Sequence, residues 1–165
     1  MATQHDQERF SALIRQHAGI VRKVATTYCR DADDRADLAQ EILAQLWAAW
    51  PRYDEARLFT TWMYRVALNV AISHVRAVYR GARHFVPLAD EHREIAAAPV
   101  DHEGRDELAQ LEGVIAGLDE LNRALLLLYL DDRGHQEIAE ILGIGESNVG
   151  TKISRLKQRI RARFA

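Results

Sequence analysis

The side chains that could carry chemistry gather at the end of this 165-residue chain, where six Lys and Arg residues and no acidic residue follow Glu146. Just before them, residues 136–142 have apolar side chains at helical spacing, and Gly143-Ile144-Gly145 interrupts the pattern. A second helical pattern follows, with an apolar side formed by Val149, Ile153, Leu156 and Ile160. Two helices joined by a short, glycine-containing turn are typical of a helix-turn-helix. Its basic second helix suits a polyanion, and an ordinary helical hairpin with a solvated end is the alternative.

The spacing within the last helix indicates which side chains would meet a nucleic acid. With about 3.6 residues per turn, the side opposite the apolar residues carries Ser147, Asn148, Thr151, Lys152 and Arg155. The N-terminal part of a recognition helix normally meets the base edges. The side chains expected to lie closest to bases are therefore Asn148, Thr151 and Arg155. Those expected to contact phosphates are Lys152, Lys157 and Arg159.

No pattern in the chain predicts catalysis. The sequence lacks a Walker phosphate loop, a glycine-rich dinucleotide turn, a His-Glu-x-x-His pair and a Gly-x-Ser-x-Gly elbow. Its seven histidines are scattered, and its single cysteine, Cys29, cannot form an internal disulfide. We therefore expect a protein that is not an enzyme and has no metal or cofactor, with Cys29 as a buried or half-buried thiol.

Helical periodicity runs through most of the chain and predicts an all-α fold. Helices are expected over residues 10–28 despite Gly19, over 35–50 with Pro51 as the stop, over 60–80, from 105 onward, and over 121–130. Residues 83–104 lose the periodicity and hold two of the three prolines, which predicts a linker. The chain would then form two small helical domains.

Two sets of side chains on these helices could bind a partner. On the helix over residues 35–50, Asp37, Gln40, Glu41 and Ala44 share one side, which the residues alone favour as a solvated face. The loop and helix over residues 51–80 combine aromatic with basic or polar side chains, namely Arg57, Phe59, Trp62, Tyr64, Arg65, Asn69, His74 and Arg76. Aromatic rings among arginines can stack on unpaired bases, although Trp62 could instead be a core residue.

Charge is distributed unevenly along the chain, although the net charge is only −2. Residues 101–146 contain twelve acidic residues and three arginines. A molecule of this kind can present one end to DNA and the other to a basic or polar partner. No apolar run reaches the roughly 18 residues needed to span a membrane, and the N-terminal residues lack a signal-peptide core. We therefore expect a cytoplasmic protein without membrane insertion.

These elements resemble one family. Residues 37–47 (DLAQEILAQLW) and 59–74 (FTTWMYRVALNVAISH) are similar to region two of the extracytoplasmic-function sigma factors, a subfamily of the sigma-70 family. Residues 136–144 (QEIAEILGI) and the basic helix after them resemble sigma region four, with Gly150 where a lysine is common. The resemblance implies region two in residues 1–82, a linker in 83–104 and region four in 105–165.

The same resemblance implies partners and roles. The face with Asp37, Gln40, Glu41 and Ala44 would dock on the clamp helices of core RNA polymerase, and region four would meet the polymerase flap. The loop and helix from Tyr53 onward would capture and melt the −10 promoter element. The last helix would read the −35 element in the major groove, and the linker would run towards the RNA exit path. An anti-sigma factor is a further candidate partner.

Two other functions remain open on the residues alone. The first is a helix-turn-helix transcriptional regulator that acts as a dimer without polymerase, which would have no need of the helix over residues 37–47. The second is a helical adaptor that binds only protein, in which the basic last helix would be a solvated end.

Overall fold

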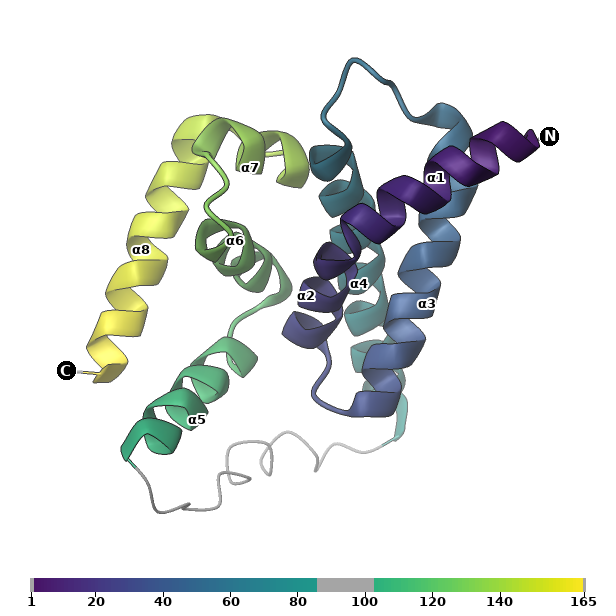
Figure 1. The fold of residues 1–165 in the computed structure, drawn as a ribbon. Coiled ribbons are helices and arrows are strands. Elements are labelled where there is room, and N and C mark those ends of the chain that lie inside the picture. Colours follow the sequence, from purple (N-terminus) through teal and green to yellow (C-terminus); the bar gives the residue numbers. More distant parts are fainter. Residues whose placement is uncertain (1, 86–102, 165) are drawn as a thin grey trace.

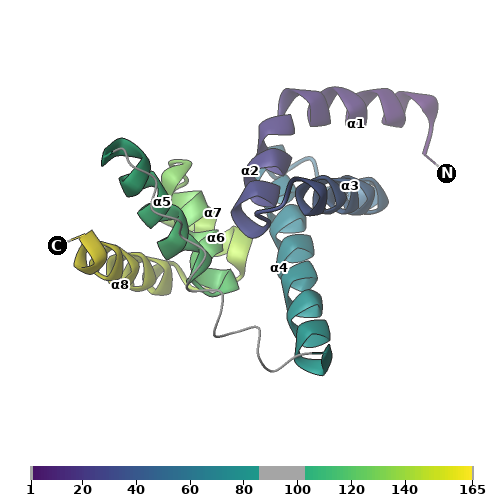
Figure 2. The same ribbon diagram turned by 90° about the horizontal axis from the view of Figure 1, so that it is seen from below.

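The protein folds into two groups of helices, described in a computed structural model that covers residues 2–85 and 103–164. The first group consists of α1 (Gln4–Gln16), α2 (Ala18–Tyr28), α3 (Ala32–Ala49), the short 3-10 helix η1 (Trp50–Arg52) and α4 (Phe59–Phe85). The second consists of α5 (Glu103–Ala116), α6 (Glu120–Leu130), α7 (His135–Leu142) and α8 (Glu146–Phe164). Figures 1 and 2 show the groups side by side. The predicted all-α, two-domain fold is confirmed.

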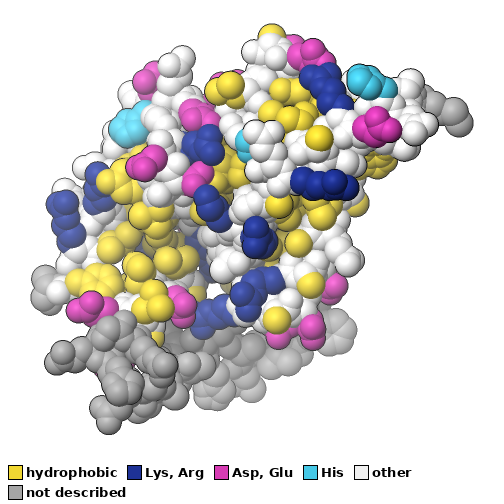
Figure 3. All heavy atoms as spheres, viewed as in Figure 1, with side chains coloured by type: hydrophobic (Ala, Val, Ile, Leu, Met, Phe, Trp, Pro, Cys, Tyr) yellow, Lys and Arg dark blue, Asp and Glu magenta, His cyan; other side chains and the backbone are white. Residues whose placement is uncertain are grey.

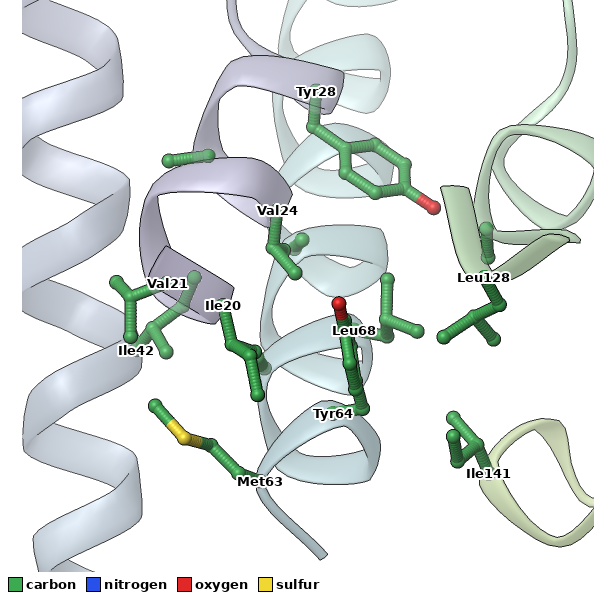
Figure 4. Close-up of a cluster of buried hydrophobic side chains, with 14 of the residues drawn as sticks. Ile20, Val21, Val24, Tyr28, Ile42, Met63, Tyr64, Leu68, Leu128 and Ile141 are labelled. Carbon is green, nitrogen blue, oxygen red and sulfur yellow. The ribbon is translucent and has the colours of Figure 1, made fainter. Parts of the chain in front are cut away.

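The first domain is built on the packing of α2, α3 and α4. The apolar stripe of α3 is completely buried at Leu38, Ile42 and Leu46. Figure 4 shows Ile42 facing Val21 of α2, with Met63 of α4 beside them. Each buried side chain of this size stabilises the fold by about 1.5–3 kcal/mol relative to an exposed position. The side of α3 away from this core is exposed, so the core fixes which residues of α3 are available to a partner.

The N-terminal helix is interrupted, and the prediction of one continuous helix over residues 10–28 is wrong. α1 ends at Gln16 and α2 begins at Ala18, because the backbone of His17 leaves the helical region with φ −115° and ψ 23°. The His17 ring lies 5.5 Å from that of Phe59, centroid to centroid. The apolar period runs unbroken across this junction in the sequence, so it could not reveal the change of direction that Figure 1 shows.

The second domain contains the predicted helix-turn-helix. Leu125, Leu128, Ile138 and Val149 have no exposed surface, and they join α6, α7 and α8 in one core. α7 ends at Gly143, which adopts the left-handed conformation with φ +69°. Glycine is favoured there because it lacks a Cβ atom that would meet the following carbonyl oxygen. The turn directs α8 across α6 and α7, with Val149, Ile153 and Leu156 facing inward.

The helices next to the predicted linker differ from expectation in their lengths. α4 continues to Phe85, beyond the predicted end at Arg80, and α5 begins at Glu103 rather than Arg105. The predicted linker, residues 83–104, therefore lies mostly outside the described residues. Cys29, expected to be buried or half-buried, is buried, and its burial raises the pKa of the thiol.

Two glycines of the helix-turn-helix should respond in opposite ways to alanine. Gly150→Ala should raise the free energy of unfolding by about 0.5–1 kcal/mol, because glycine inside a helix is destabilising relative to alanine. The new Cβ would meet only the His135 ring, at 3.6 Å, which is an ordinary contact. Gly143→Ala should lower that free energy by about 1–2 kcal/mol, because alanine is strained at its positive φ. Denaturant unfolding of the full chain measures both, and equal effects would contradict this account.

Candidate nucleic-acid interface

The N-terminal half of α8 presents an exposed polar surface on the side away from the core. Its exposed residues there are Ser147, Asn148, Thr151 and Arg155, while Val149 and Ile153 on the opposite side are buried. The Thr151 hydroxyl donates a hydrogen bond to the Ser147 carbonyl at 3.2 Å, which holds this side chain against its own helix. Lys152 is partly buried. The residues expected to lie closest to bases therefore share one accessible face.

The two residues further along α8 differ in their surroundings. Lys157 is partly buried, and its Nζ lies 4.5 Å from the centre of the Tyr129 ring of α6, a cation–π contact. Arg159 is exposed. The contact with Tyr129 limits the freedom of the Lys157 side chain, since a cation over an aromatic face is attracted to it. Lys157 therefore joins the basic surface of α8 to α6.

The expected partner-binding side of α3 is exposed. Asp37, Gln40, Glu41 and Ala44 all lie on the surface. Two large apolar side chains accompany them, because Leu43 and Trp47 each keep 37% of their surface exposed. An exposed apolar pair beside polar groups is typical of a surface that binds protein.

His74 lies with this α3 surface rather than with the other aromatic and polar residues of α4. Its Nδ1 is 3.5 Å from Glu41 Oε2. The structure therefore separates His74 from the α4 residues with which the sequence grouped it.

An aromatic cluster shapes the loop between α3 and α4. Trp50, Tyr53, Phe59 and Trp62 contact one another with ring centroids 4.9–6.4 Å apart. Phe59 is buried and Trp62 partly buried, so both are largely occupied in packing the loop. The Tyr53 hydroxyl donates to the Arg57 carbonyl at 2.8 Å, and Leu58 remains 71% exposed. Leu58, which sequence reasoning overlooked, is therefore an exposed apolar side chain of this loop.

Tyr64 is not the exposed aromatic that we expected. It has no exposed surface, and Figure 4 shows Leu128 of α6 and Ile141 of α7 on its side towards the second domain. Its hydroxyl donates to Asp131 Oδ2 at 2.6 Å, and the Arg133 guanidinium lies 5.1 Å from its ring centre. Burial, followed by the bond to Asp131, raises the pKa of the Tyr64 hydroxyl. Stacking of Tyr64 on a base would require the two domains to separate.

Asp131 is the centre of a polar network at the domain boundary. It accepts a hydrogen bond from Lys23 Nζ of α2 at 2.5 Å and from Arg133 Nε at 3.1 Å, in addition to that from Tyr64. Arg133 Nη1 also donates to Glu137 at 3.1 Å and to the Thr60 hydroxyl at 3.3 Å. The network therefore joins α2 and α4 of the first domain to the α6–α7 turn of the second.

Two ion pairs and two hydrogen bonds flank this network. Arg57 Nη1 lies 3.8 Å from Glu140 Oε1, and Arg76 Nε lies 3.5 Å from Glu120 Oε1. The Thr61 hydroxyl donates to Glu137 at 3.0 Å, and the Tyr28 hydroxyl donates to the backbone carbonyl of Glu120 at 2.6 Å. Arg57 and Arg76, two candidate DNA contacts, thus form ion pairs with acidic residues of the second domain. The excess of acids in residues 101–146 was the only sequence signal of this interface.

The remaining candidates on α4, Arg65 and Asn69, are exposed. Across residues 2–85 and 103–164 we find no group of three or more His, Cys, Asp or Glu side chains that could hold a metal ion. Within the same ranges, no helix is long and apolar enough to cross a membrane.

Comparison with known proteins assigns both halves of the chain to one family. Residues 13–90 match Sigma-70 region 2, and residues 108–160 match Sigma-70, region 4. The chain belongs to the sigma-70 family of RNA polymerase sigma factors. It is a promoter-recognition subunit, which binds core polymerase and directs initiation at the −10 and −35 elements.

Its relatives place the chain in the extracytoplasmic-function group. It is 26% identical to the sigma factor NccH of Alcaligenes xylosoxydans xylosoxydans, over 98% of this chain and 89% of that protein. It is 23% identical to the extracytoplasmic-function sigma factor SigW of Bacillus subtilis, over 94% of this chain and 89% of SigW.

Two solved structures share the fold. One is CnrH in complex with the cytosolic domain of CnrY, with TM-score 0.66 and 22% identity over 94% of this chain and 87% of that one. The other is RpoE from Bartonella quintana with the anti-sigma factor NepR, with TM-score 0.74 and 18% identity over 95% and 97%.

Tyr64 should behave as a structural residue in the free chain. Tyr64→Ala should lower the free energy of unfolding by about 3–5 kcal/mol, because it leaves a cavity in a fully buried site. Tyr64→Phe keeps the ring and should cost only about 1 kcal/mol, since Asp131 retains Lys23 and Arg133 as donors. Denaturant titration compares the two variants, and a small loss for Tyr64→Ala would mean that the ring is not packed as described.

Proposed function

We propose that this sigma factor reads the −35 element with the N-terminal half of α8. The observation that carries the proposal is the exposure of Asn148, Thr151 and Arg155 on one face, opposite a buried apolar face. Residues near the start of a recognition helix reach base edges in the major groove. Ser147 and Lys152 border this face, and Lys157 and Arg159 would hold phosphates further along α8.

Removal of Arg155 and of Lys157 should have different effects on promoter choice. Arg155→Ala should cost about 1–3 kcal/mol at the preferred −35 sequence and relax preference at one base pair. Lys157→Ala should weaken binding to all promoters alike. It should also reduce the slope of log affinity against log salt concentration by about one. Transcription from a library with a randomised −35 element, using core polymerase and each variant, separates the two. An unchanged preference without the side chains of Asn148, Thr151 and Arg155 would rule out α8 as the reader.

We propose that the exposed side of α3 docks on the clamp helices of core polymerase. Asp37, Gln40, Glu41 and Ala44 would provide the polar part of the contact. Leu43 and Trp47, both 37% exposed, would provide the apolar part. The combination supports a protein-binding surface better than a solvated face, because solvated faces do not need an exposed tryptophan.

Charge reversal on α3 should weaken assembly with polymerase. The double variant Asp37→Lys with Glu41→Lys should bind core polymerase at least tenfold more weakly, because it places like charge or unpaired charge in the contact. A matched control, Glu107→Lys with Glu112→Lys, makes the same change of net charge on exposed residues of α5. Circular dichroism checks that both keep their helix content. If the α3 variant binds core polymerase as tightly as the wild type, the polar side of α3 is a solvated face and not a docking surface.

We further propose that α4 and the loop before it capture and melt the −10 element. Arg65 and Asn69 are exposed in the described structure, and Arg57 lies on the surface beside the exposed Leu58. Arg76 extends this basic surface along α4. Phe59 and Trp62 would act mainly by holding the shape of the loop, since both contribute to the aromatic cluster.

We propose that region two spans residues 1–82, the linker residues 83–104, and region four residues 105–165. Figure 3 shows hydrophobic side chains gathered over the second domain, and α6 and α8 contribute the exposed side chains Tyr129, Leu130 and Phe164. This surface would bind the polymerase flap.

The protein would have no catalytic step of its own and would act in the cytoplasm, where bacterial polymerase transcribes. An anti-sigma factor is a proposed partner, as for RpoE with NepR.

A further inference from the structure

The N-terminal helix α1 contacts the segment between α3 and α4 through two neighbouring side chains. Arg9 Nη1 donates a hydrogen bond to Glu55 Oε1, and the Arg9 guanidinium lies 5.6 Å from the centre of the Trp50 ring. The Phe10 ring lies 5.4 Å from that of Trp50, centroid to centroid, and Phe10 is buried. Figure 1 shows α1 crossing the end of α3 from which this segment starts. We call residues 53–58 the capture loop.

The capture loop is fixed at both ends and joined to α1 in the middle. At its start the Tyr53 ring stacks on Trp50 with centroids 5.3 Å apart. At its end α4 begins with the buried Phe59. Glu55 lies between these two anchors. The pair that it forms with Arg9 therefore restrains the middle of the loop, which the aromatic contacts at the ends do not reach directly.

The pair between Arg9 and Glu55 should matter more for ligand binding than for the stability of the fold. The Arg9 side chain keeps 43% of its surface exposed and that of Glu55 keeps 66%, and exposed ion pairs contribute little to folding. Binding is different, because a loop that orders only when it meets its ligand loses conformational freedom at that moment. A loop that α1 already restrains loses less freedom and binds more tightly.

We propose that α1 holds the capture loop in the conformation that binds the unpaired −10 strand, and that Arg9 is the positioning residue, acting through Glu55. This inference rests on the proposed −10 role of the loop and of α4. Arg57 and the exposed Leu58 would meet the DNA. Arg9 would not touch it, because Glu55 and Trp50 already occupy its guanidinium. Arg9 belongs to none of the sets of candidate residues that the sequence predicted.

Binding of an unpaired −10 strand by holoenzyme tests the role of Arg9. The probe is a fluorescent fork-junction DNA with an unpaired −10 strand, in the −10 sequence that wild-type holoenzyme selects from a random library. Arg9→Ala should weaken binding of this probe about threefold to tenfold, because the loop then loses more freedom on binding. Arg9→Lys should stay within about twofold of the wild type, since an ammonium can still pair with Glu55 and lie over the Trp50 ring. A loss as large as that of Arg9→Ala would overturn the proposal.

A double-mutant cycle separates positioning from direct contact with DNA. If Arg9 acts through Glu55, Arg9→Ala should cause no further loss of affinity in a chain that already carries Glu55→Ala. Equal losses in the two backgrounds would overturn the proposal, because Arg9 would then act on the DNA itself or through another residue. Denaturant unfolding of the free chain should give the wild-type midpoint for Arg9→Ala, since the pair is exposed. A destabilised fold would overturn the positioning role.

Arg15→Ala is the matched control, because it removes the same charge from an exposed position on the same helix. This variant should bind the probe as tightly as the wild type, and a loss equal to that of Arg9→Ala would overturn the proposal.

The −10 role of α4 is tested separately with the double variant Arg65→Ala, Asn69→Ala on the same probe. Unchanged binding by that variant would remove the proposed −10 role of these two residues, and the cycle of Arg9 with Glu55 would still decide the role of α1. Weaker binding by that variant, together with unchanged binding by Arg9→Ala, would overturn only the role of α1.

Discussion

The packing of the buried Tyr64 ring against the turn that carries Asp131 is the contact on which the arrangement of the two domains depends. The ring comes from α4 and has no exposed surface, and its hydroxyl donates to Asp131 at 2.6 Å in the turn that precedes α7. A buried hydroxyl without a hydrogen-bond partner would lower the stability of the fold. The Tyr64 hydroxyl therefore keeps its acceptor only while Asp131 stays in place. Lys23 and Arg133 hold Asp131 from two further sides. The same small network therefore helps to determine which face of α4 the second domain covers.

Periodicity in the sequence was sufficient to predict most helices of the fold but not their lengths, the break at His17 or their mutual contacts. The apolar positions of α8 predicted its buried side, because a helix that packs on a core repeats its apolar residues in register with its turns. The break at His17 escaped prediction because Phe10 to Tyr28 kept that register across a local change in backbone direction. Sequence spacing describes a helix, whereas a junction depends on what the next helix packs against.

The exposure of the candidate residues was predicted well where one helix carries them and poorly where two domains share them. Asn148, Thr151 and Arg155 lie together on α8 as their spacing required. Tyr64 was misjudged because its surroundings come from Asp131 and Arg133, 67 and 69 positions further along the chain. A polar, aromatic position on a helix can face solvent or a second domain, and no local pattern distinguishes these environments. Only the surplus of acids in residues 101–146 hinted that a basic partner existed.

The state of Asp131 also restricts how the contact can open. Burial would raise the pKa of its carboxyl, but hydrogen bonds from Lys23, Tyr64 and Arg133 outweigh burial and hold the pKa below its usual value of 3.8. A carboxyl with a lowered pKa stabilises the fold above its unfolded-state pKa, and this contribution is lost as the pH falls through the folded-state value. Asp131 is therefore ionised at neutral pH. Protonation of Asp131 cannot weaken the contact there, so the pH dependence of this carboxyl acts only under acidic conditions.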